Sequence, residues 1–381
     1  MSRFIFSADG HIVEPPTLFL DGLPPPMRDQ AIHSEKRDDY MCTVSGEKII
    51  FRMRMRPGAA TSAASGGDAL SLRGPDAPPS RKALGANNIA GRLQDMEEEG
   101  IDAEIVFPSL GLWTYALENP EVELATTQVY NDWHNGFFIG HTDTFVRCAI
   151  LPVRRLEDTV HELKRIAALG FTAAMLPSIT MTGIPAYNDE AWDPVFHAAG
   201  ELGIAFVLHT GTGAETVVVE RGPGAAVINY TRQMGDGQNA IMALVAGGVL
   251  DRNPKAKVAV IESGASWLAA LAERMDEVYL AHAVFVRPRL SMMPSEIIRR
   301  QVKCSFQYDR ACIMSRSVTG HEAIMWGSDY PHAEGTFPHS PTVLAKLFDG
   351  IDISEREKAD IVGGNAARLF RLPRPEFAAA A

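Results

Sequence analysis

Eight short apolar segments, each ending in polar residues, recur along most of the chain. Longer segments separate them, in which apolar residues repeat at intervals of three and four, and the clearest of these predict helices over 156–169, 193–202 and 267–279. Parallel strands need a long crossover, so strands that alternate with helices indicate a parallel sheet. The eight predicted strands cover residues 4–11, 103–109, 148–153, 173–178, 205–211, 258–263, 302–308 and 323–329.

Eight strand–helix units in a chain of 381 residues have the size of a closed (β/α)8 barrel of the TIM type. An open, doubly wound sheet is the alternative, and it is disfavoured because no glycine-rich phosphate-binding turn follows the first strand. We therefore predict an α/β fold in which residues 1–381 form a single barrel domain with a helical C-terminal tail over 353–381.

Two long segments interrupt the alternation. The first covers residues 12–90 after strand one, and its middle, 57–80, is so rich in small residues, Gly and Pro that we expect a mobile or partner-ordered loop. Basic and apolar residues alternate over 48–56, which predicts a small half-buried strand. The second segment, 212–250 after strand five, contains a predicted helix over 239–250.

The composition narrows the class of protein. With 36 basic and 47 acidic residues, the net charge of −11 argues against a nucleic-acid-binding protein, which needs a basic face. We expect no membrane span, since no apolar run reaches 18 residues, and no signal peptide, since charges come too early. The four cysteines form no CxxC pair, which fits a cytoplasmic protein without a zinc ribbon or a disulfide framework.

Side chains that can bind a metal follow four of the predicted strands. Because side chains alternate along a strand, Asp9 and His11 point to the same side, into the barrel mouth. Carboxylates and imidazoles together suit Zn²⁺, Fe²⁺ or Mn²⁺ better than Ca²⁺ or Mg²⁺. A metal with an open position acidifies a bound water or polarises a substrate oxygen. The candidates are Asp9 and His11 on strand one, His209 on strand five, Glu262 on strand six, and Asp329 with His332 at strand eight.

Several short motifs occur in one order over nearly the whole chain. They are Asp9-x-His11-x-x-Glu14-Pro15, Phe107-Pro108-Ser109, Tyr130-Asn131-Asp132-Trp133, His209-Thr-Gly, Glu262-Ser-Gly-Ala-Ser-Trp267, Gly327-Ser-Asp329-Tyr-Pro-His332 and Gly364-Asn365-Ala-Ala-Arg-Leu-Phe370. With these motifs the chain resembles the amidohydrolase-related family of the amidohydrolase superfamily, which includes the aminocarboxymuconate-semialdehyde and γ-resorcylate decarboxylases. The resemblance implies a (β/α)8 barrel that holds one divalent metal through Asp9, His11, His209 and Asp329.

Two positions depart from that pattern. The decarboxylases end strand six with a histidine that acts as acid or base, where this chain has Glu262, which can also carry a proton if burial raises its pKa. Strand four ends at Ser178 without the lysine that bridges two metals in binuclear hydrolases of the superfamily. A second metal would then need other ligands, and the candidates are Glu14, Glu262 and His332. A small branch of the superfamily uses such a dinuclear site to activate oxygen.

Four further residues are candidates for contacts with the substrate. Arg52, Arg54 and Arg56 lie in the first long segment, from which the family's decarboxylases draw an arginine for the substrate carboxylate. The alternative is that these arginines form the exposed face of an edge strand. Trp113 follows strand two at the functional end of the barrel and is expected to line the pocket.

These observations predict a metal-dependent enzyme that hydrolyses or non-oxidatively decarboxylates a small carboxylated substrate, with Glu262 and His332 moving protons. One Zn, Fe or Mn ion is expected, and a second is an open alternative. Two other functions stay open, an oxygen-dependent hydroxylase with non-heme Fe or Mn and a supporting subunit of a hetero-oligomeric enzyme. We expect a homodimer or higher oligomer, with a related subunit as a further alternative.

Overall fold

The computed structural model describes residues 4–55, 83–213, 219–332 and 334–373. Eight neighbouring strands form one parallel sheet, and β2 (His11–Ile12) extends the first of them beside β6. Main-chain hydrogen bonds close the barrel between its last and first strands, from Ala8 N to Trp326 O at 2.9 Å and from Asp329 N to Asp9 O at 2.9 Å. The prediction of a (β/α)8 barrel is confirmed. In order around the barrel the strands are β1 (Phe6–Ser7), β6 (Ala103–Pro108), β7 (Phe145–Ile150), β8 (Ala173–Pro177), β9 (Ala205–His209), β10 (Lys257–Ile261), β11 (Val302–Phe306) and β12 (Ile324–Trp326).

The strands are buried on both faces, as expected of a parallel sheet covered by helices. Every residue of β6, β7, β8 and β9 is buried, which explains why these segments are continuous apolar runs rather than alternating patterns. Side chains from all eight strands join a single hydrophobic core that fills the barrel and the space under its helices.

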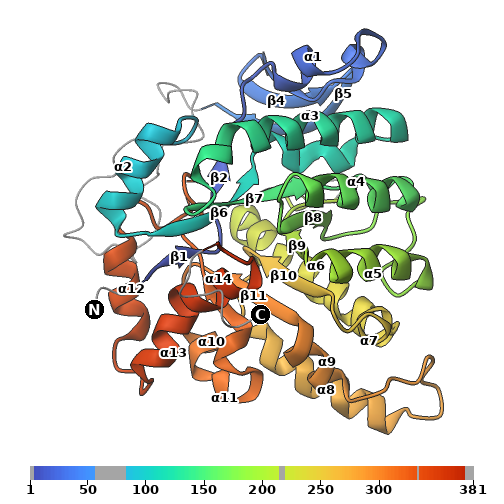
Figure 1. Cartoon of the computed structure of the whole chain (residues 1–381), viewed down its shortest axis with the longest axis vertical. Helices are drawn as coiled ribbons and strands as arrows, with labels where there is room; N and C mark the ends of the chain where they lie inside the picture. The colour runs from blue at the N-terminus through green and yellow to red at the C-terminus, as the bar shows by residue number, and fades with distance from the viewer. Residues whose placement is uncertain (1–3, 56–82, 214–218, 333, 374–381) are drawn as a thin grey trace.

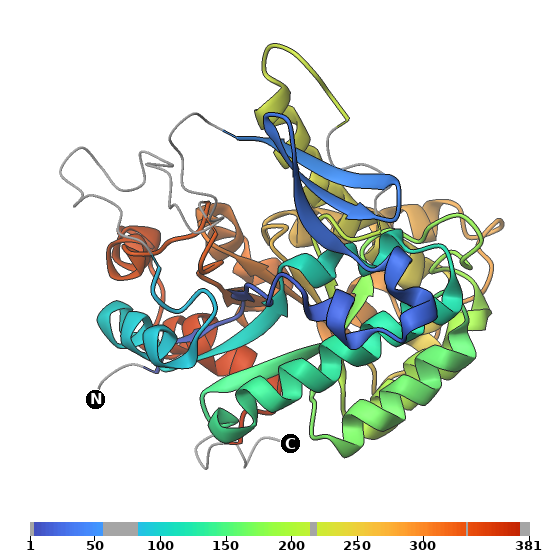
Figure 2. The ribbon, with the colours of Figure 1, turned by 90° about the horizontal axis from the view of Figure 1, so that it is seen from above.

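Helices surround the barrel, and two views show them packed outside the strands (Figures 1 and 2). The predicted helix over 193–202 matches α5, and the one over 156–169 ends one residue earlier, at Ala168. The main helices are α2 (Ile89–Glu99), α3 (Pro120–Phe138), α4 (Leu156–Ala168), α5 (Asp193–Leu202), α6 (Ala225–Ala246), α8 (Trp267–Ala281), α9 (Pro294–Gln301) and α12 (Ser340–Phe348). The shorter ones are α7 (Val249–Arg252), α10 (Arg310–Met314), α11 (Arg316–Thr319), α13 (Glu355–Ala359) and α14 (Asn365–Leu369).

The helix of the second long segment differs from its prediction. Instead of covering 239–250, α6 begins at Ala225 and ends at Ala246, and Gly248, with a φ of 77°, separates it from α7. Two glycines near the middle of α6, Gly235 and Gly237, do not break the helix, and Gly237 packs against the barrel. A Cβ there would lie 2.4 Å from Val260 Cγ1, so only glycine lets the helix approach β10 this closely.

The first long segment contains a small antiparallel sheet of β3 (His33–Arg37), β4 (Tyr40–Ser45) and β5 (Lys48–Arg54), preceded by α1 (Leu18–Gly22). The strand predicted over 48–56 is therefore present as β5. Phe51 of β5 stacks on Trp113 with ring centroids 5.1 Å apart, which places this sheet against the segment that follows β6. The loop predicted over 57–80 lies outside the described residues.

Candidate metal centre and active site

Three ligand atoms meet at the carboxyl end of the barrel, two from the β1–β2 stretch and one from β9. His11 Nε2 lies 3.1 Å from His209 Nε2. Asp9 Oδ1 lies 3.6 Å from the first of these nitrogens and 3.7 Å from the second. The three side chains are at most 1% exposed. The alternation of β1–β2 and the end of β9 thus bring Asp9, His11 and His209 into one group that can hold a metal ion.

Asp329 joins this group from the end of β12. Its Oδ1 lies 3.6 Å from His11 Nε2 and 2.9 Å from His332 Nδ1. With a φ of 55°, Asp329 adopts the left-handed conformation that non-glycine residues rarely take, and such strain concentrates at functional sites. The four residues predicted to bind metal are therefore neighbours in the folded chain.

The two histidines present lone pairs to each other. Their Nδ1 atoms lie 2.7 Å from Pro108 O and 3.0 Å from Thr210 O, and because a carbonyl oxygen only accepts, both Nδ1 atoms carry a proton. In the neutral rings both Nε2 atoms are then unprotonated, and they face each other at 3.1 Å. A cation between them would turn this repulsion into attraction.

The buried carboxylates lack partners as well. Among the described residues neither oxygen of Asp9 accepts a hydrogen bond, nor does Oδ2 of Asp329, although both side chains are buried. A buried carboxylate without partners costs several kcal/mol, so it normally pairs with a cation. The donor set of two carboxylates and two imidazoles fits Zn²⁺, Fe²⁺ or Mn²⁺.

Burial and the neighbouring side chains of the cluster shift the pKa values of three of its members. Burial, followed by the charge of Asp9, raises the pKa of Asp329 well above its usual range. Burial, followed by the charges of His332 and His209, lowers the pKa of His11. For His209, burial acts to lower the pKa, but the carboxylates of Asp9 and Glu262 outweigh it and raise the pKa overall.

Glu262 lies beside this cluster rather than within it. Its Oε2 is 3.7 Å from His209 Nδ1, and its side chain is 17% exposed. Like Asp329 it has a left-handed backbone, with a φ of 61°, and its main-chain N–H donates to Ser305 Oγ at 3.0 Å. Burial, then the charge of Asp329, raises the pKa of Glu262 well above its usual range. Glu262 thus lies beside the cluster with its protonated form favoured, and its role as a proton donor stays a prediction.

His332 covers the outer side of the cluster. Its ring centroid lies 4.1 Å from that of His11, and its side chain is 21% exposed. Because its Nδ1 bonds Asp329 Oδ1, the ring is oriented by a metal-ligand candidate, and it is the member of the group nearest to solvent.

Two residues of the site were missed from the sequence. Glu334, with Glu262 and Asp329, forms a second group of three ligand atoms within 4.8 Å of one another. Tyr230 of α6 donates to Glu334, and the charge of this carboxylate raises the pKa of Tyr230 to about 12. Glu334 follows His332 by two residues, and this closeness to a candidate site residue could have indicated it. Nothing in the local sequence distinguishes Tyr230.

Glu14 has a different role from the ligands. Its carboxylate accepts main-chain hydrogen bonds from Ser109, Leu110 and Gly111, the closest at 2.8 Å from Leu110 N. These amides belong to the start of the 3-10 helix Leu110–Ala116. Glu14, a candidate ligand for a second metal, instead stabilises the turn after β6, and both of its oxygens accept main-chain hydrogen bonds.

The predicted substrate contacts lie in the first long segment and beside it. Arg52 and Arg54 are on the exposed face of β5, and the Arg52 guanidinium lies over the Tyr40 ring, 5.2 Å from its centroid. Arg56 is outside the described residues. One face of Trp113 is occupied by Phe51. A substrate contact from any of these residues stays a prediction.

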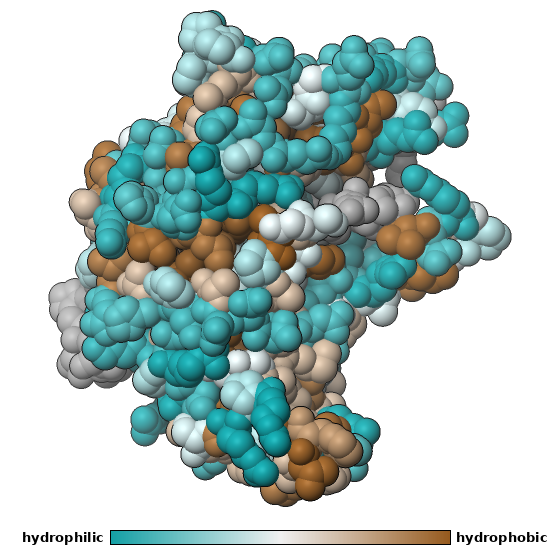
Figure 3. Space-filling view, turned by 90° about the vertical axis from the view of Figure 1, so that its right-hand side faces the viewer, coloured by the Kyte–Doolittle hydropathy of each residue, from teal (hydrophilic) through white to brown (hydrophobic). Residues whose placement is uncertain are grey.

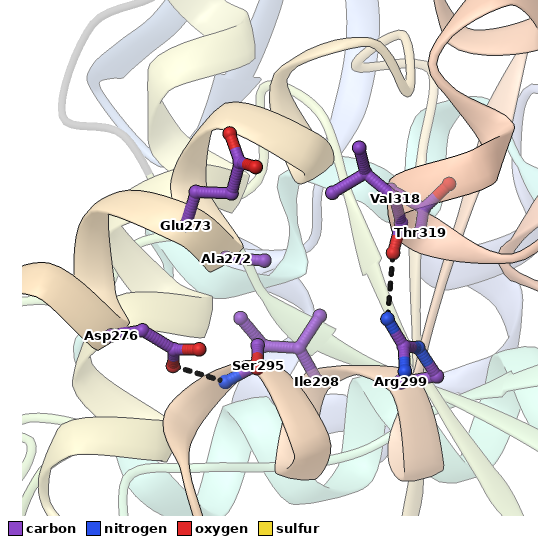
Figure 4. A pocket seen from close by; sticks show the side chains of 8 residues that line it. All are labelled: Ala272, Glu273, Asp276, Ser295, Ile298, Arg299, Val318 and Thr319. Carbon is purple, nitrogen blue, oxygen red and sulfur yellow. Dashed lines mark hydrogen bonds between the residues drawn. The ribbon is translucent and has the colours of Figure 1, made fainter.

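A surface hollow of about 290 Å³ lies away from this site, between α8, α9 and α11 (Figure 4). Its polar groups bond within the wall, where Asp276 accepts from Ser295 N at 2.9 Å and Arg299 donates to Val318 O at 2.8 Å. None of the metal-ligand candidates lines it. The hollow gives no reason to place the chemistry there.

The surface seen in Figure 3 is mainly hydrophilic, with apolar areas between. The most exposed large apolar side chains of the described residues include Leu280, Val284 and Phe285 at and after the end of α8, the last of them 81% exposed. No helix in the described ranges has both the length and the apolar character needed to cross a bilayer. The homo-oligomer, with or without a related subunit, stays a prediction.

Comparisons with known proteins agree with this fold. A family model described as Amidohydrolase matches residues 81–372. The 2-amino-3-carboxymuconate-6-semialdehyde decarboxylase of Dictyostelium discoideum is 24% identical over 292 residues, which span 74% of this chain and 76% of that protein.

Solved structures share the fold. An amidohydrolase from Mycobacterium avium subsp. paratuberculosis K-10 has a TM-score of 0.77 at 18% identity, over 97% of this chain and 100% of that one. The dihydroxybenzoic acid decarboxylase of Polaromonas sp. JS666, solved with bound manganese and the inhibitor 2-nitroresorcinol, has a TM-score of 0.62 at 17% identity, over 99% of each chain.

The family match extends over most of the chain and includes His209, Glu262 and Asp329, while Asp9 and His11 precede it. The resemblance inferred from the motifs and the prediction of a metal-dependent enzyme are confirmed. The chain belongs to the amidohydrolase family.

Proposed function

We propose that the protein is a metal-dependent decarboxylase that removes CO2 from a small substrate bearing a carboxylate next to an enol or phenol oxygen. The observation that carries the proposal is the buried cluster of two carboxylates and two imidazoles with unused lone pairs, beside a glutamate whose pKa is raised. The decarboxylase names of the Dictyostelium and Polaromonas proteins support the reaction class.

Asp9, His11, His209 and Asp329 are the residues that would hold the metal. When bound, a divalent metal acts as a Lewis acid that neutralises the substrate carboxylate and the neighbouring oxygen. Which metal is bound is part of the proposal, and manganese is favoured by the ion present in the Polaromonas decarboxylase.

Glu262 supplies the proton. Burial and the charge of Asp329 raise the pKa of Glu262, which favours the protonated form of its carboxyl group. This proton is added to the carbon that bears the carboxylate, the bond between that carbon and the carboxyl carbon then breaks, and CO2 leaves. The electron pair of the broken bond stays on the ring or enol system, so charge and atoms balance without an oxidant.

His332 connects this step to solvent. It is partly exposed and bonded to Asp329, so it can exchange a proton with water and with the substrate oxygen nearby. Hydrolysis of a small carboxylated substrate would use the same residues, but water would attack the substrate as a nucleophile instead of a proton being added to carbon.

A second candidate function is an oxygen-dependent hydroxylase with two metals. The group of Glu262, Asp329 and Glu334 favours it, because these ligand atoms lie within 4.8 Å of one another and share Asp329 with the first cluster. In that case Glu262 would be a ligand and no longer a proton donor.

Metal-free protein loaded separately with Mn²⁺, Zn²⁺ or Fe²⁺ distinguishes these functions. It is incubated in D2O, once without oxygen and once with it, with ring-substituted 2-hydroxybenzoates and with aminocarboxymuconate semialdehyde. Decarboxylation predicts one CO2 per substrate consumed and one deuterium at the vacated carbon. Product formation that requires one O2 per turnover, or no CO2 release with any metal and substrate, would contradict the proposal.

A further inference from the structure

The seam where β12 meets β1 carries the metal-ligand candidates on both of its sides. Asp9 and His11 lie on one side and Asp329 on the other, and main-chain bonds join them, including His11 N to Tyr330 O at 2.5 Å. The two strands are short, β1 with two residues and β12 with three, so the sheet itself fixes this seam with few hydrogen bonds. Side chains behind the seam must therefore contribute to the spacing of the ligands.

One buried side chain contacts both sides of the seam. Arg92 of α2 is 0% exposed, and its Nη1 donates to the main-chain carbonyl of His11 at 2.5 Å. Its guanidinium lies over the ring of Tyr330, 4.8 Å from the centroid, and Tyr330 directly follows Asp329. Nε of Arg92 bonds the buried carboxylate of Glu104 on β6, which balances its charge.

Two hydrogen bonds hold the hydroxyl group of Tyr330. Its hydroxyl donates to Asp95 Oδ2 at 2.6 Å and accepts from Gly85 N at 2.8 Å. Asp95 lies one turn after Arg92 on the same helix, so two side chains of α2 contact residues of the seam. The fit is close, because a Cβ on Gly85 would lie 2.1 Å from Arg92 Cα.

We propose that Arg92 is a positioning residue of the metal centre, which sets the distance between the His11 and Asp329 segments from behind. The His11 ring is held at Nδ1 by Pro108 O and its main chain is held by Arg92, so both the ring and its backbone have defined places. Partners that orient ligands typically change metal affinity 10- to 100-fold when they are replaced. The inference rests on the metal site of the proposed function.

Arg147 provides a matched control. It is also a nearly buried arginine, on β7, and its guanidinium donates to Gly170 O at 3.0 Å and to Asn135. Among the described residues, Arg147 donates hydrogen bonds to Asn135, Leu169 and Gly170. None of these is a ligand candidate or adjacent to one. Replacing it disturbs a buried arginine network without touching the seam.

The test measures Mn²⁺ affinity by calorimetry and the Tm of the metal-free protein for wild type, R92K, Y330F and R147K. We expect R92K to weaken Mn²⁺ binding 10- to 100-fold, Y330F to weaken it less, and R147K to leave it within about twofold even where its Tm falls as far as that of R92K. Wild-type affinity in R92K, or equal losses of affinity in R92K and R147K, would overturn the positioning role.

Y330F keeps the test decisive if R92K does not fold, since it removes only the hydroxyl contacts to Asp95 and Gly85. Unchanged affinity in a folded Y330F would then count against the inference. If wild type binds none of Mn²⁺, Zn²⁺ and Fe²⁺, the proposed metal site itself is wrong. Equal affinity in wild type and variants is a different result, which would contradict only the positioning role of Arg92.

Discussion

Asp9 and Glu14 belong to the same short stretch of chain at the barrel mouth, and both carboxylates are buried, yet their surroundings differ. Glu14 accepts from three main-chain amides, so both of its oxygens are used inside the protein. Neither oxygen of Asp9 has a hydrogen-bond partner among the described residues. A buried carboxylate that the protein satisfies is part of the structure, whereas one that it leaves unsatisfied next to other ligands is prepared for a cation.

Glu123 of α3 is intermediate between Asp9 and Glu14, because only one of its two carboxylate oxygens accepts hydrogen bonds. Its Oε2 accepts from Val153 N at 3.0 Å and Arg154 N at 2.9 Å, while its Oε1 has no partner among the described residues. None of the groups of potential metal ligands found among the described residues includes Glu123, and burial raises its pKa to about 7. Without a cation site, a half-satisfied carboxyl group is expected to keep its proton.

Removing a ligand should have the largest effect. Asp329→Ala or His209→Ala is expected to lower bound metal well below one equivalent and to reduce activity at least about 1000-fold, because the remaining ligands no longer close the site. Metal content after dialysis, measured by elemental analysis, checks this. Full metal content in either folded variant would show that these four side chains do not hold the metal. The unsatisfied carboxylate of Asp9 would then not mark a metal site, in contrast to the satisfied one of Glu14.

Glu262→Gln separates the proton donor from the ligands. We expect turnover to fall about 10²- to 10⁴-fold, because the amide cannot donate the required proton, while one equivalent of metal stays bound. Steady-state rates and elemental analysis on the same preparation measure both quantities. Loss of metal in this variant would instead support a ligand role for Glu262 and the two-metal alternative.

Glu123→Gln should remove part of the pH dependence of stability. The pKa of Glu123 in the folded protein, about 7, exceeds that of an unfolded glutamate, so folding favours the protonated form. Its contribution is therefore fully present below about pH 4 and decreases as the pH rises toward 7, by roughly 3 kcal/mol in all. Urea unfolding of both proteins between pH 4 and 8 tests this, and equal slopes would contradict it.

Glu14→Gln should have the smallest effect. It is expected to lower the free energy of unfolding by about 1–2 kcal/mol, since the amide group cannot accept from all three main-chain donors. Metal content should not change. A loss of metal at wild-type stability would show that Glu14 belongs to the metal site rather than to the turn.

The sequence predicted the barrel and the position of the ligands because both follow from local patterns. All eight strands occur where apolar runs predicted them, and Asp9, His11, His209 and Asp329 meet because each ends a strand of one parallel sheet. Long-range features were not predictable in this way. Glu334 and Tyr230 reach the site from a loop and an inserted helix, and α6 extends further than predicted because Gly237 lets it pack on the barrel.

The role of Arg92 was also hidden, because the single residue gives no sign that its helix lies behind the seam. Glu14 shows the same limit, since the sequence made it a candidate ligand for a second metal, whereas the structure places it in a turn. Only the amides of the turn after β6, far away in the sequence, decide between these roles.

Anomalous diffraction at the Mn, Fe and Zn absorption edges, from crystals of protein loaded with one metal at a time, tests the central claim most directly. We predict a peak about 2.0–2.2 Å from His11 Nε2 and His209 Nε2, bound also by carboxylate oxygens of Asp9 and Asp329. A crystal loaded with metal that shows no peak among these four side chains, or a peak bound by other residues, would contradict the account.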